Sequence, residues 1–169
     1  CIVACSWGML RSGKGVMFVP RIVSVGTAVP PYEVPQEQAQ QFARDMFSGA
    51  FPDIERLLRV FDHAHIKKRH FSVPFDWFQE PRSFQEKNDT YIKVACELAV
   101  QAIEACLHRA QVSVREIDHL LFVSTTGIAT PSIDALVANR LSVSPRMKRT
   151  PIWGLGCAGG AVGLARAYE

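Results

Sequence analysis

Hydrophobic residues recur along the chain with two spacings, and the two spacings alternate. Runs of β-branched and apolar residues predict strands at 21–27, at 118–124 and, as a short stretch, near 149–153. Apolar residues three and four positions apart predict helices at 35–47, 53–63, about 89–110, 132–141 and directly after Cys157. This order predicts an α/β fold with a largely parallel sheet, whose functional groups lie at the carboxyl ends of the strands.

Local features refine these elements. Asp53 and Ser132 each precede a helix and are candidate N-caps. The strand at 118–124 is mostly apolar, which indicates a buried strand. Residues 72–88 combine aromatic and polar side chains with two prolines, so we expect a surface loop there.

The composition is that of a globular protein. With 169 residues, 48% of them hydrophobic, the chain can bury one ordinary core. Its 19 basic and 16 acidic residues leave too small an excess to predict binding to nucleic acid or a membrane surface. No apolar run reaches the ~18 residues of a membrane span.

The cysteine pattern indicates a reducing, cytoplasmic setting. The five cysteines have no repeated spacing, so neither a disulfide framework nor a zinc module is predicted. Cys96 and Cys106 fall on the apolar stripe of the long helix and are expected in the core. His63, His65 and His70 lack an accompanying cysteine or carboxylate pattern, so no metal site is predicted.

Residues 1–16 differ from the rest of the chain. They lack an initial methionine, and their basic residues follow the apolar stretch, which is the reverse of a signal peptide. We interpret this segment as non-native or translated from upstream sequence, with Met17 as the natural start. Residues 17–169 then form the folded part.

The most informative local pattern surrounds Cys157, which lies in a glycine-dense turn between a short strand and a helix of small residues. A helix N-terminus favours a thiolate, and glycines let a substrate carbonyl approach the backbone, so a nucleophile is one interpretation. Gly154, Gly156 and Gly159 also have the spacing of a dinucleotide fingerprint. The third interpretation is a buried structural cysteine.

Three stretches together are similar to one family. Residues 66–71 (IKKRHF), 120–132 (LLFVSTTGIATPS) and 153–161 (WGLGCAGGA) resemble type III polyketide synthases, the chalcone and stilbene synthase-like condensing enzymes. The cysteine turn is most similar to the bacterial branch. The resemblance runs from about Met17 to Glu169, which corresponds to the N-terminal half of such an enzyme.

The resemblance implies a fold and a reaction. The fold is a thiolase-like layered α/β/α sandwich, of which this chain supplies the N-terminal half, and the complete enzyme is a homodimer. Cys157 matches the nucleophile that takes a starter acyl group from an acyl-CoA and extends it with malonyl-CoA units. No permanently bound cofactor is implied. The catalytic His and Asn of the family belong to the C-terminal half, so this chain alone is expected to be inactive.

The resemblance also assigns binding residues. Arg56 and Arg59 match positions that contact coenzyme A phosphates, and guanidinium groups suit bidentate phosphate binding. His63 takes a third such position, where the family often has lysine. Thr125 and Thr130 match positions that line the substrate cavity. The ordinary alternatives are a solvated helix face for the basic residues and a capping turn for Thr130.

The product class is less defined. Thr130 stands where plant members usually carry methionine, which leaves room for a fatty acyl starter and favours alkylpyrone or alkylresorcinol products over chalcone-type ones. Two alternatives differ in kind: another thiolase-like condensing enzyme, such as a ketoacyl-acyl-carrier-protein synthase III or a hydroxymethylglutaryl-CoA synthase, or a non-catalytic truncated remnant.

Overall fold

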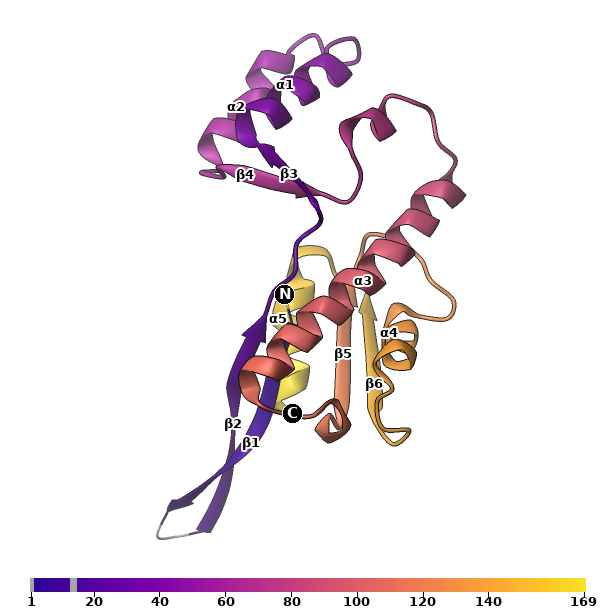
Figure 1. The fold of residues 1–169 in the computed structure, drawn as a ribbon. Helices are drawn as coiled ribbons and strands as arrows, with labels where there is room; N and C mark the ends of the chain where they lie inside the picture. Colours follow the sequence, from indigo (N-terminus) through magenta and orange to yellow (C-terminus); the bar gives the residue numbers. More distant parts are fainter. Residues whose placement is uncertain (1, 13–14) are drawn as a thin grey trace. The chain divides into compact units, whose positions relative to one another are not determined.

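The computed structural model describes residues 2–12 and 15–169, with side chains from residue 20 onward. Two compact units make up the chain: a larger unit, Cys1–Ala28 with Ser83–Glu169, and a smaller unit, Val29–Arg82. The elements, labelled in Figure 1, are β1 (Ile2–Ser12), β2 (Gly15–Gly26), β3 (Tyr32–Pro35), α1 (Gln36–Phe47), α2 (Ile54–His63), β4 (Lys68–Phe71), η1 (Phe75–Phe78), α3 (Phe84–Ala110), η2 (Val114–Glu116), β5 (His119–Ser124), α4 (Ile133–Leu141), β6 (Lys148–Trp153), η3 (Gly156–Ala158) and α5 (Gly159–Tyr168).

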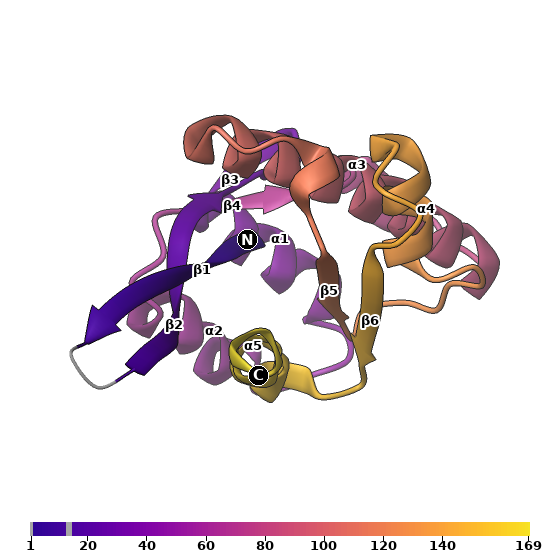
Figure 2. The same cartoon turned by 90° about the horizontal axis from the view of Figure 1, so that it is seen from below.

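The larger unit is layered around β5 and β6. These strands are parallel, in a register that runs from His119 opposite Lys148 to Ser124 opposite Trp153. Helix α5 covers one face of the pair, and α3 and α4 lie on the other face (Figure 2). The small residues of α5 permit its close approach, since a Cβ at Gly159 would come within 2.6 Å of a Val123 methyl group. The expected α/β/α layering is therefore present.

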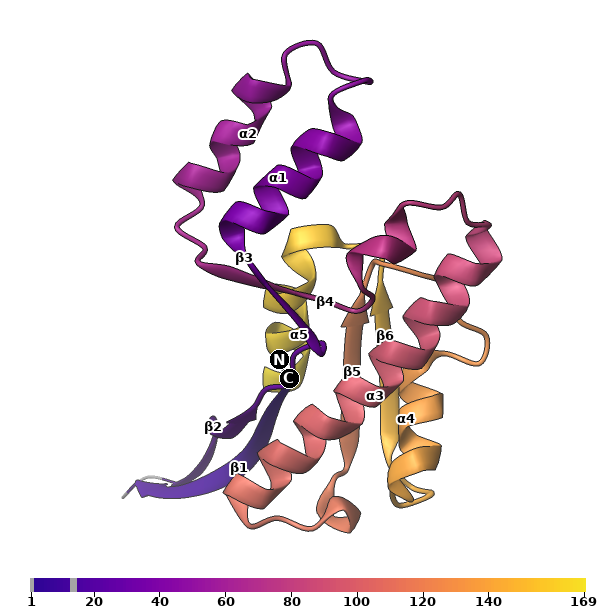
Figure 3. The same ribbon diagram turned by 45° about the horizontal axis from the view of Figure 1, so that its top comes forward.

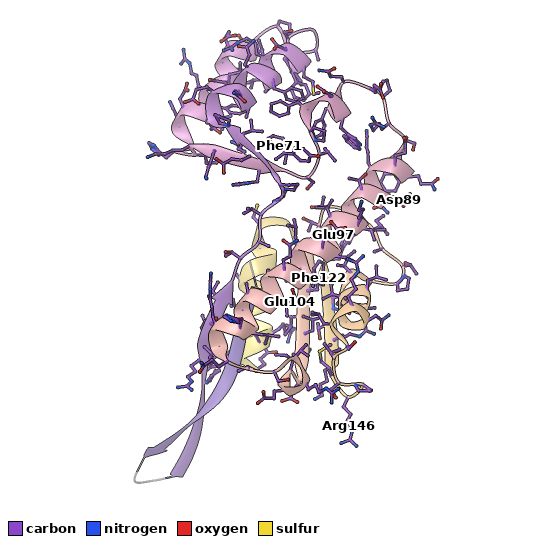
Figure 4. All side chains as sticks on the ribbon, in the orientation of Figure 1. Phe71, Asp89, Glu97, Glu104, Phe122 and Arg146 are labelled. Atoms are coloured by element: carbon purple, nitrogen blue, oxygen red, sulfur yellow. The ribbon has the colours of Figure 1, made fainter. Side chains whose placement is uncertain are left out.

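The core of the larger unit lies between α3, α4 and the inner face of β5. Its buried members come from α3 and α4 and are Cys96, Ala99, Ile103, Leu107, Ile133 and Val137. Phe122, labelled in Figure 4, packs against this cluster from β5, while Glu97 and Glu104 lie on the exposed face of α3. The predicted burial of Cys96 and Cys106 is confirmed, because each is only 1% exposed.

The strand predicted at 21–27 is the end of a longer strand, β2, which pairs antiparallel with β1. Residues 2–12 of the segment that we set apart thus form a strand, and residues 1, 13 and 14 lie outside the described residues. The natural start at Met17 stays a prediction. Gly26 passes so close to α3 that an added Cβ would lie 2.0 Å from the Ala102 carbonyl oxygen.

The prediction of one largely parallel sheet is wrong for the described residues. They form three two-stranded sheets, of which only β5 with β6 is parallel. Strands that neighbour each other in sequence pair antiparallel at a low cost of loop closure, as β1 and β2 do. The strand at 118–124 is also less buried than expected, with Val123 37% exposed beside α5.

The smaller unit packs α1 and α2 side by side next to the antiparallel pair β3 and β4 (Figure 3). Half-buried aromatic rings cluster in this unit. Phe42 stacks on Phe75 with ring centroids 4.3 Å apart. Phe71, labelled in Figure 4, meets the Phe75 ring edge-on at 5.2 Å. The buried hydrophobic residues of this unit are Val34 of β3, Ala39 of α1 and Leu58 of α2.

The start of one helix and the capping bonds of two others differ from the predictions. The expected loop at 72–88 contains the short η1 turn, and α3 already begins at Phe84, because Ser83 and Glu86 form a reciprocal capping box. Asp53 and Ser132 do precede α2 and α4, but neither side chain accepts a capping hydrogen bond.

No helix in the described part of the chain has the length and apolar character needed to cross a membrane.

Candidate functional site

Cys157 lies in a turn whose backbone requires glycine. The chain leaves β6 through Gly154 and Gly156, which have φ angles of +83° and +52°. A Cβ at either glycine would meet no atom within 4 Å, so the positive φ and not crowding makes glycine necessary there. Cys157 follows in the η3 turn, two residues ahead of the first residue of α5. The predicted strand, glycine turn and helix are all present.

The Cys157 side chain is exposed, whereas the other two cysteines with described side chains are buried. Burial raises the pKa of the Cys96 thiol above its ordinary value, which disfavours its thiolate. Accessibility therefore singles out Cys157 among these three. The interpretation of Cys157 as a buried structural residue is wrong for this chain.

The loop that follows β5 lies at the same edge of the strand pair as the cysteine turn. Ser124 and Trp153 are the last paired residues of the two parallel strands, so both strands end together. The Trp153 indole N–H donates to the Gly127 carbonyl at 2.9 Å and ties this loop to the end of β6. Thr125 and Thr130 are exposed, and the Thr130–Pro131 peptide bond is cis. The structure thus places both threonines and Cys157 at one edge of the larger unit.

A mostly apolar pocket of about 230 Å³ opens beside this loop. Its walls come from α3, β5, the loop after β5, the start of α4 and β6, and the residues are Tyr91, Phe122, Ser124, Gly127, Ile128, Ala129, Ser132, Ile133, Asp134, Pro151, Ile152 and Trp153. Cys157, Thr125 and Thr130 are not among them. The pocket is consequently a neighbour of the predicted site residues and is not formed by them.

Asp134 is a functional candidate that the sequence analysis missed. It is fully buried in the first turn of α4, and its Oδ2 accepts a hydrogen bond from Arg149 Nη1 at 2.7 Å. Its Oδ1 is buried without a hydrogen-bond partner among the described residues. The pair joins residues that are 15 positions apart, and no local pattern marks them as partners.

The basic residues predicted for phosphate binding lie on one face of α2 in the smaller unit. Arg56, Arg59 and His63 are spaced three and four residues apart and are all exposed. Arg56 pairs with Asp53 at 3.0 Å, while Arg59 has no hydrogen-bond or ion-pair partner among the described residues. The face therefore presents one unpaired guanidinium and one that shares its charge with a carboxylate.

Solved structures define the class of protein. The structure of 1,3,6,8-tetrahydroxynaphthalene synthase from Streptomyces coelicolor A3(2), a bacterial type III polyketide synthase, matches with a TM-score of 0.76 and 26% sequence identity. The match covers 85% of this chain and 42% of that one. The chain thus has the thiolase-like fold of a type III polyketide synthase, as its sequence predicts.

Sequence comparison then gives the family. Residues 11–169 match "Chalcone and stilbene synthases, N-terminal domain", and the chain belongs to this family. It is 46% identical over 153 residues to a Bacillus subtilis (strain 168) protein named "Putative chalcone synthase", covering 88% of this chain and 42% of that protein. It is 32% identical over 148 residues to a 1,3,6,8-tetrahydroxynaphthalene synthase of Streptomyces peucetius subsp. caesius, covering 88% and 39%. The chain spans about two fifths of the length of these relatives.

Proposed function

We propose that the complete enzyme containing this chain is an acyltransferase that builds polyketides from an acyl-CoA starter and malonyl-CoA. The observation that supports it most is the exposed Cys157 thiol in a glycine turn directly ahead of α5. A helix dipole stabilises a nearby anion by ~0.3–2 kcal/mol, which lowers a thiol pKa only in part. A cationic partner is also needed, and the family resemblance assigns that role to a histidine of the C-terminal half.

The proposed reaction loads the cysteine and then extends the chain. The Cys157 thiolate attacks the carbonyl carbon of the starter thioester, and coenzyme A leaves as a thiolate that takes up a proton. Malonyl-CoA then loses CO2, and the resulting enolate carbon attacks the Cys157 thioester and displaces the thiolate. For a further extension, the lengthened chain, now a coenzyme A thioester, returns to Cys157 by the same attack. Donors aimed at the enolate oxygen lower this barrier, a task for the His and Asn that the family resemblance places in the C-terminal half.

The nucleophile is tested by labelling. The complete protein is treated with one equivalent of iodoacetamide, and the adduct is mapped by peptide mass spectrometry. We expect the label on Cys157 together with loss of condensation, while Cys96→Ala, the matched variant at a buried cysteine, keeps both label and activity. A label mainly on Cys96 or Cys106, with activity intact, contradicts the proposal.

The basic face of α2 is proposed to bind the phosphates of coenzyme A. Arg59→Ala should raise KM for acyl-CoA more than it lowers kcat, because a contact remote from the reacting carbonyl acts about equally in ground and transition states. Arg56→Ala should have a smaller effect, since Arg56 shares its charge with Asp53. A short acyl-pantetheine, which lacks the nucleotide phosphates, is the control. An equal loss on that substrate contradicts phosphate binding.

The starter is proposed to be a fatty acyl-CoA, and the products alkylpyrones or alkylresorcinols. The small, exposed Thr130 supports this, because it leaves more volume than the methionine usual in plant members. Competition between a long-chain acyl-CoA and coumaroyl-CoA tests it, and a preference for coumaroyl-CoA overturns it. We further propose that the complete enzyme is a cytoplasmic homodimer without a permanently bound cofactor.

A further inference from the structure

The loop between β5 and α4 is fastened to α3 by a single amide side chain. Asn88 donates from Nδ2 to the Ile128 carbonyl oxygen at 2.7 Å and accepts from the Ile128 backbone N–H at Oδ1 at 2.9 Å. Both backbone polar groups of one loop residue are thus satisfied by one side chain 40 positions away. Exchanging the amide oxygen and nitrogen would set donor against donor and acceptor against acceptor, so the two bonds define the orientation of the amide.

The neighbouring residue fits the same arrangement. A Cβ on Gly127 would lie 2.3 Å from the Tyr91 ring and 2.8 Å from Asn88 Oδ1, so the loop contacts α3 with no space between them. Tyr91 also forms a 2.6 Å hydrogen bond with Ser124 at the end of β5. Residues from two consecutive turns of α3, together with Trp153, therefore hold the loop in place at Gly127 and Ile128.

The local structure of α3 does not explain an asparagine at position 88. It lies inside α3, where asparagine is a weaker helix former than most residues. The N-terminus of α3 is already capped by Ser83 and Glu86, so Asn88 is not needed as a cap. A residue that disagrees with its local structure while satisfying a distant backbone indicates selection for the distant contact.

We infer that Asn88 is a positioning residue. It holds the loop in place and thereby positions Thr125 and Thr130 at the substrate cavity. Thr130 lies two residues beyond the clamped Ile128, and Thr125 lies three residues before it. Apart from the contacts of Ser124, Gly127 and Ile128, no hydrogen bond to another element holds residues 124–130 among the described interactions. The inference rests on the proposed function, because that function makes the two threonines part of the cavity.

Two substitutions in the complete enzyme test the two hydrogen bonds between Asn88 and Ile128. Asn88→Ala removes both, so we expect the Ile128 amide to exchange its hydrogen about tenfold faster or more. KM for the starter should rise and the ratio of products differing in number of extensions should change, while the rate of Cys157 alkylation by iodoacetamide stays the same. Asp89→Ala, at the exposed next position of α3, is the matched control and should leave all these readouts unchanged.

Asn88→Asp keeps the acceptor for the Ile128 N–H but places a carboxylate oxygen against the Ile128 carbonyl. The activity of Asn88→Asp relative to the unsubstituted enzyme should rise as the pH falls, because a protonated carboxyl group regains a hydrogen-bond donor. If the bonds to Ile128 do not affect the reaction, Asn88→Asp has the same pH profile as the unsubstituted enzyme, which contradicts the inference.

The outcomes separate the inference from the proposed function. If the unsubstituted enzyme condenses substrates but Asn88→Ala has the same amide exchange, KM and product ratio, the inference is wrong. If Asn88→Ala speeds exchange while KM and products stay unchanged, Asn88 holds the loop without positioning the cavity, which also overturns the inference. If the unsubstituted enzyme forms no thioester on Cys157 and no polyketide, the proposed function fails instead.

Discussion

The two units of the chain are stabilised in different ways. The smaller unit has a half-buried aromatic cluster beside a few buried aliphatic residues, and its ion pairs are on the surface, such as Arg44 with Glu55 at 2.6 Å and Lys68 with Glu33 at 2.7 Å. The larger unit has an aliphatic core that includes the fully buried Asp134. A surface pair contributes little because water screens it, whereas a buried charge depends on its partner. Equivalent substitutions should therefore have unequal effects in the two units.

The larger unit also exposes apolar surface. Its exposed large apolar residues include Ile22, Ile128, Trp153, Leu164 and Tyr168, each 49–67% accessible. β5 and β6 have no further strand partners among the described residues. Such faces and edges are covered in stable proteins, so this unit is expected to need further chain or a partner.

The largest expected effect comes from producing the 169-residue chain alone. We expect aggregation or a loosely packed state without condensing activity, because apolar faces and strand edges stay uncovered. Size-exclusion chromatography with light scattering, thermal unfolding and a malonyl-CoA decarboxylation assay measure this. A monodisperse monomer with one cooperative transition contradicts the folding prediction, and measurable condensation shows that the His and Asn which the family resemblance places in the C-terminal half are not required.

The next largest effect concerns the buried pair in the complete protein. Arg149→Met leaves the Asp134 carboxylate buried without its ion-pair partner and should lower the free energy of unfolding by about 3–5 kcal/mol. Asp134→Asn should cost less, because Arg149 is 40% exposed and its guanidinium can turn to water. Urea denaturation of both variants gives the comparison. The opposite order would contradict the prediction, because it would mean that losing the carboxylate costs more than leaving it buried without Arg149.

Two glycines give a matched pair across the units. Gly26→Ala in the larger unit forces a methyl group against the Ala102 carbonyl oxygen and should destabilise the protein by about 1–3 kcal/mol or more. Gly49 in the smaller unit has nothing within 4 Å of its would-be Cβ, so Gly49→Ala should be neutral or stabilise by about 0.4–1 kcal/mol through the unfolded chain. Thermal unfolding distinguishes them, and equal shifts would show that the close approach at Gly26 relaxes freely.

The smallest effect is expected at the surface pair of the smaller unit. The hydrogen bond from Arg44 lowers the pKa of Glu55, so this pair stabilises the folded state above the ordinary glutamate pKa and stops doing so as the pH falls through the lowered value. Glu55→Gln should therefore remove a small pH dependence below about pH 4.3 and change little at pH 7. Urea midpoints measured across this range, with added salt as the control, test the prediction.

Most of the features that the sequence predicted are encoded locally. The glycines around Cys157 determine their own backbone, and the periodic apolar residues placed α1, α2 and most of α3. The start of α3 was missed although its signal is local, since Ser83 and Glu86 have the spacing of a capping box. The prolines and aromatic residues before it favoured a loop.

The features that the sequence did not predict depend on pairs of residues far apart in the chain. Asp134 meets Arg149 across 15 positions, and Asn88 meets Ile128 across 40. In each pair the spacing and the residue types alone fit many surface sites equally well. The same limit applies to the sheets, because which strand pairs with which depends on closure of the chain and not on the pattern within one strand.

The indole of Trp153 makes the edge of this site visible to spectroscopy. It is one of three tryptophans in the sequence, is 61% exposed, and donates to the loop at Gly127. Anything that covers this edge should move the ring into a drier environment and shift its emission to shorter wavelength. In a background where Trp7 and Trp77 are replaced by phenylalanine, this one fluorophore would report in real time when the site is filled or covered.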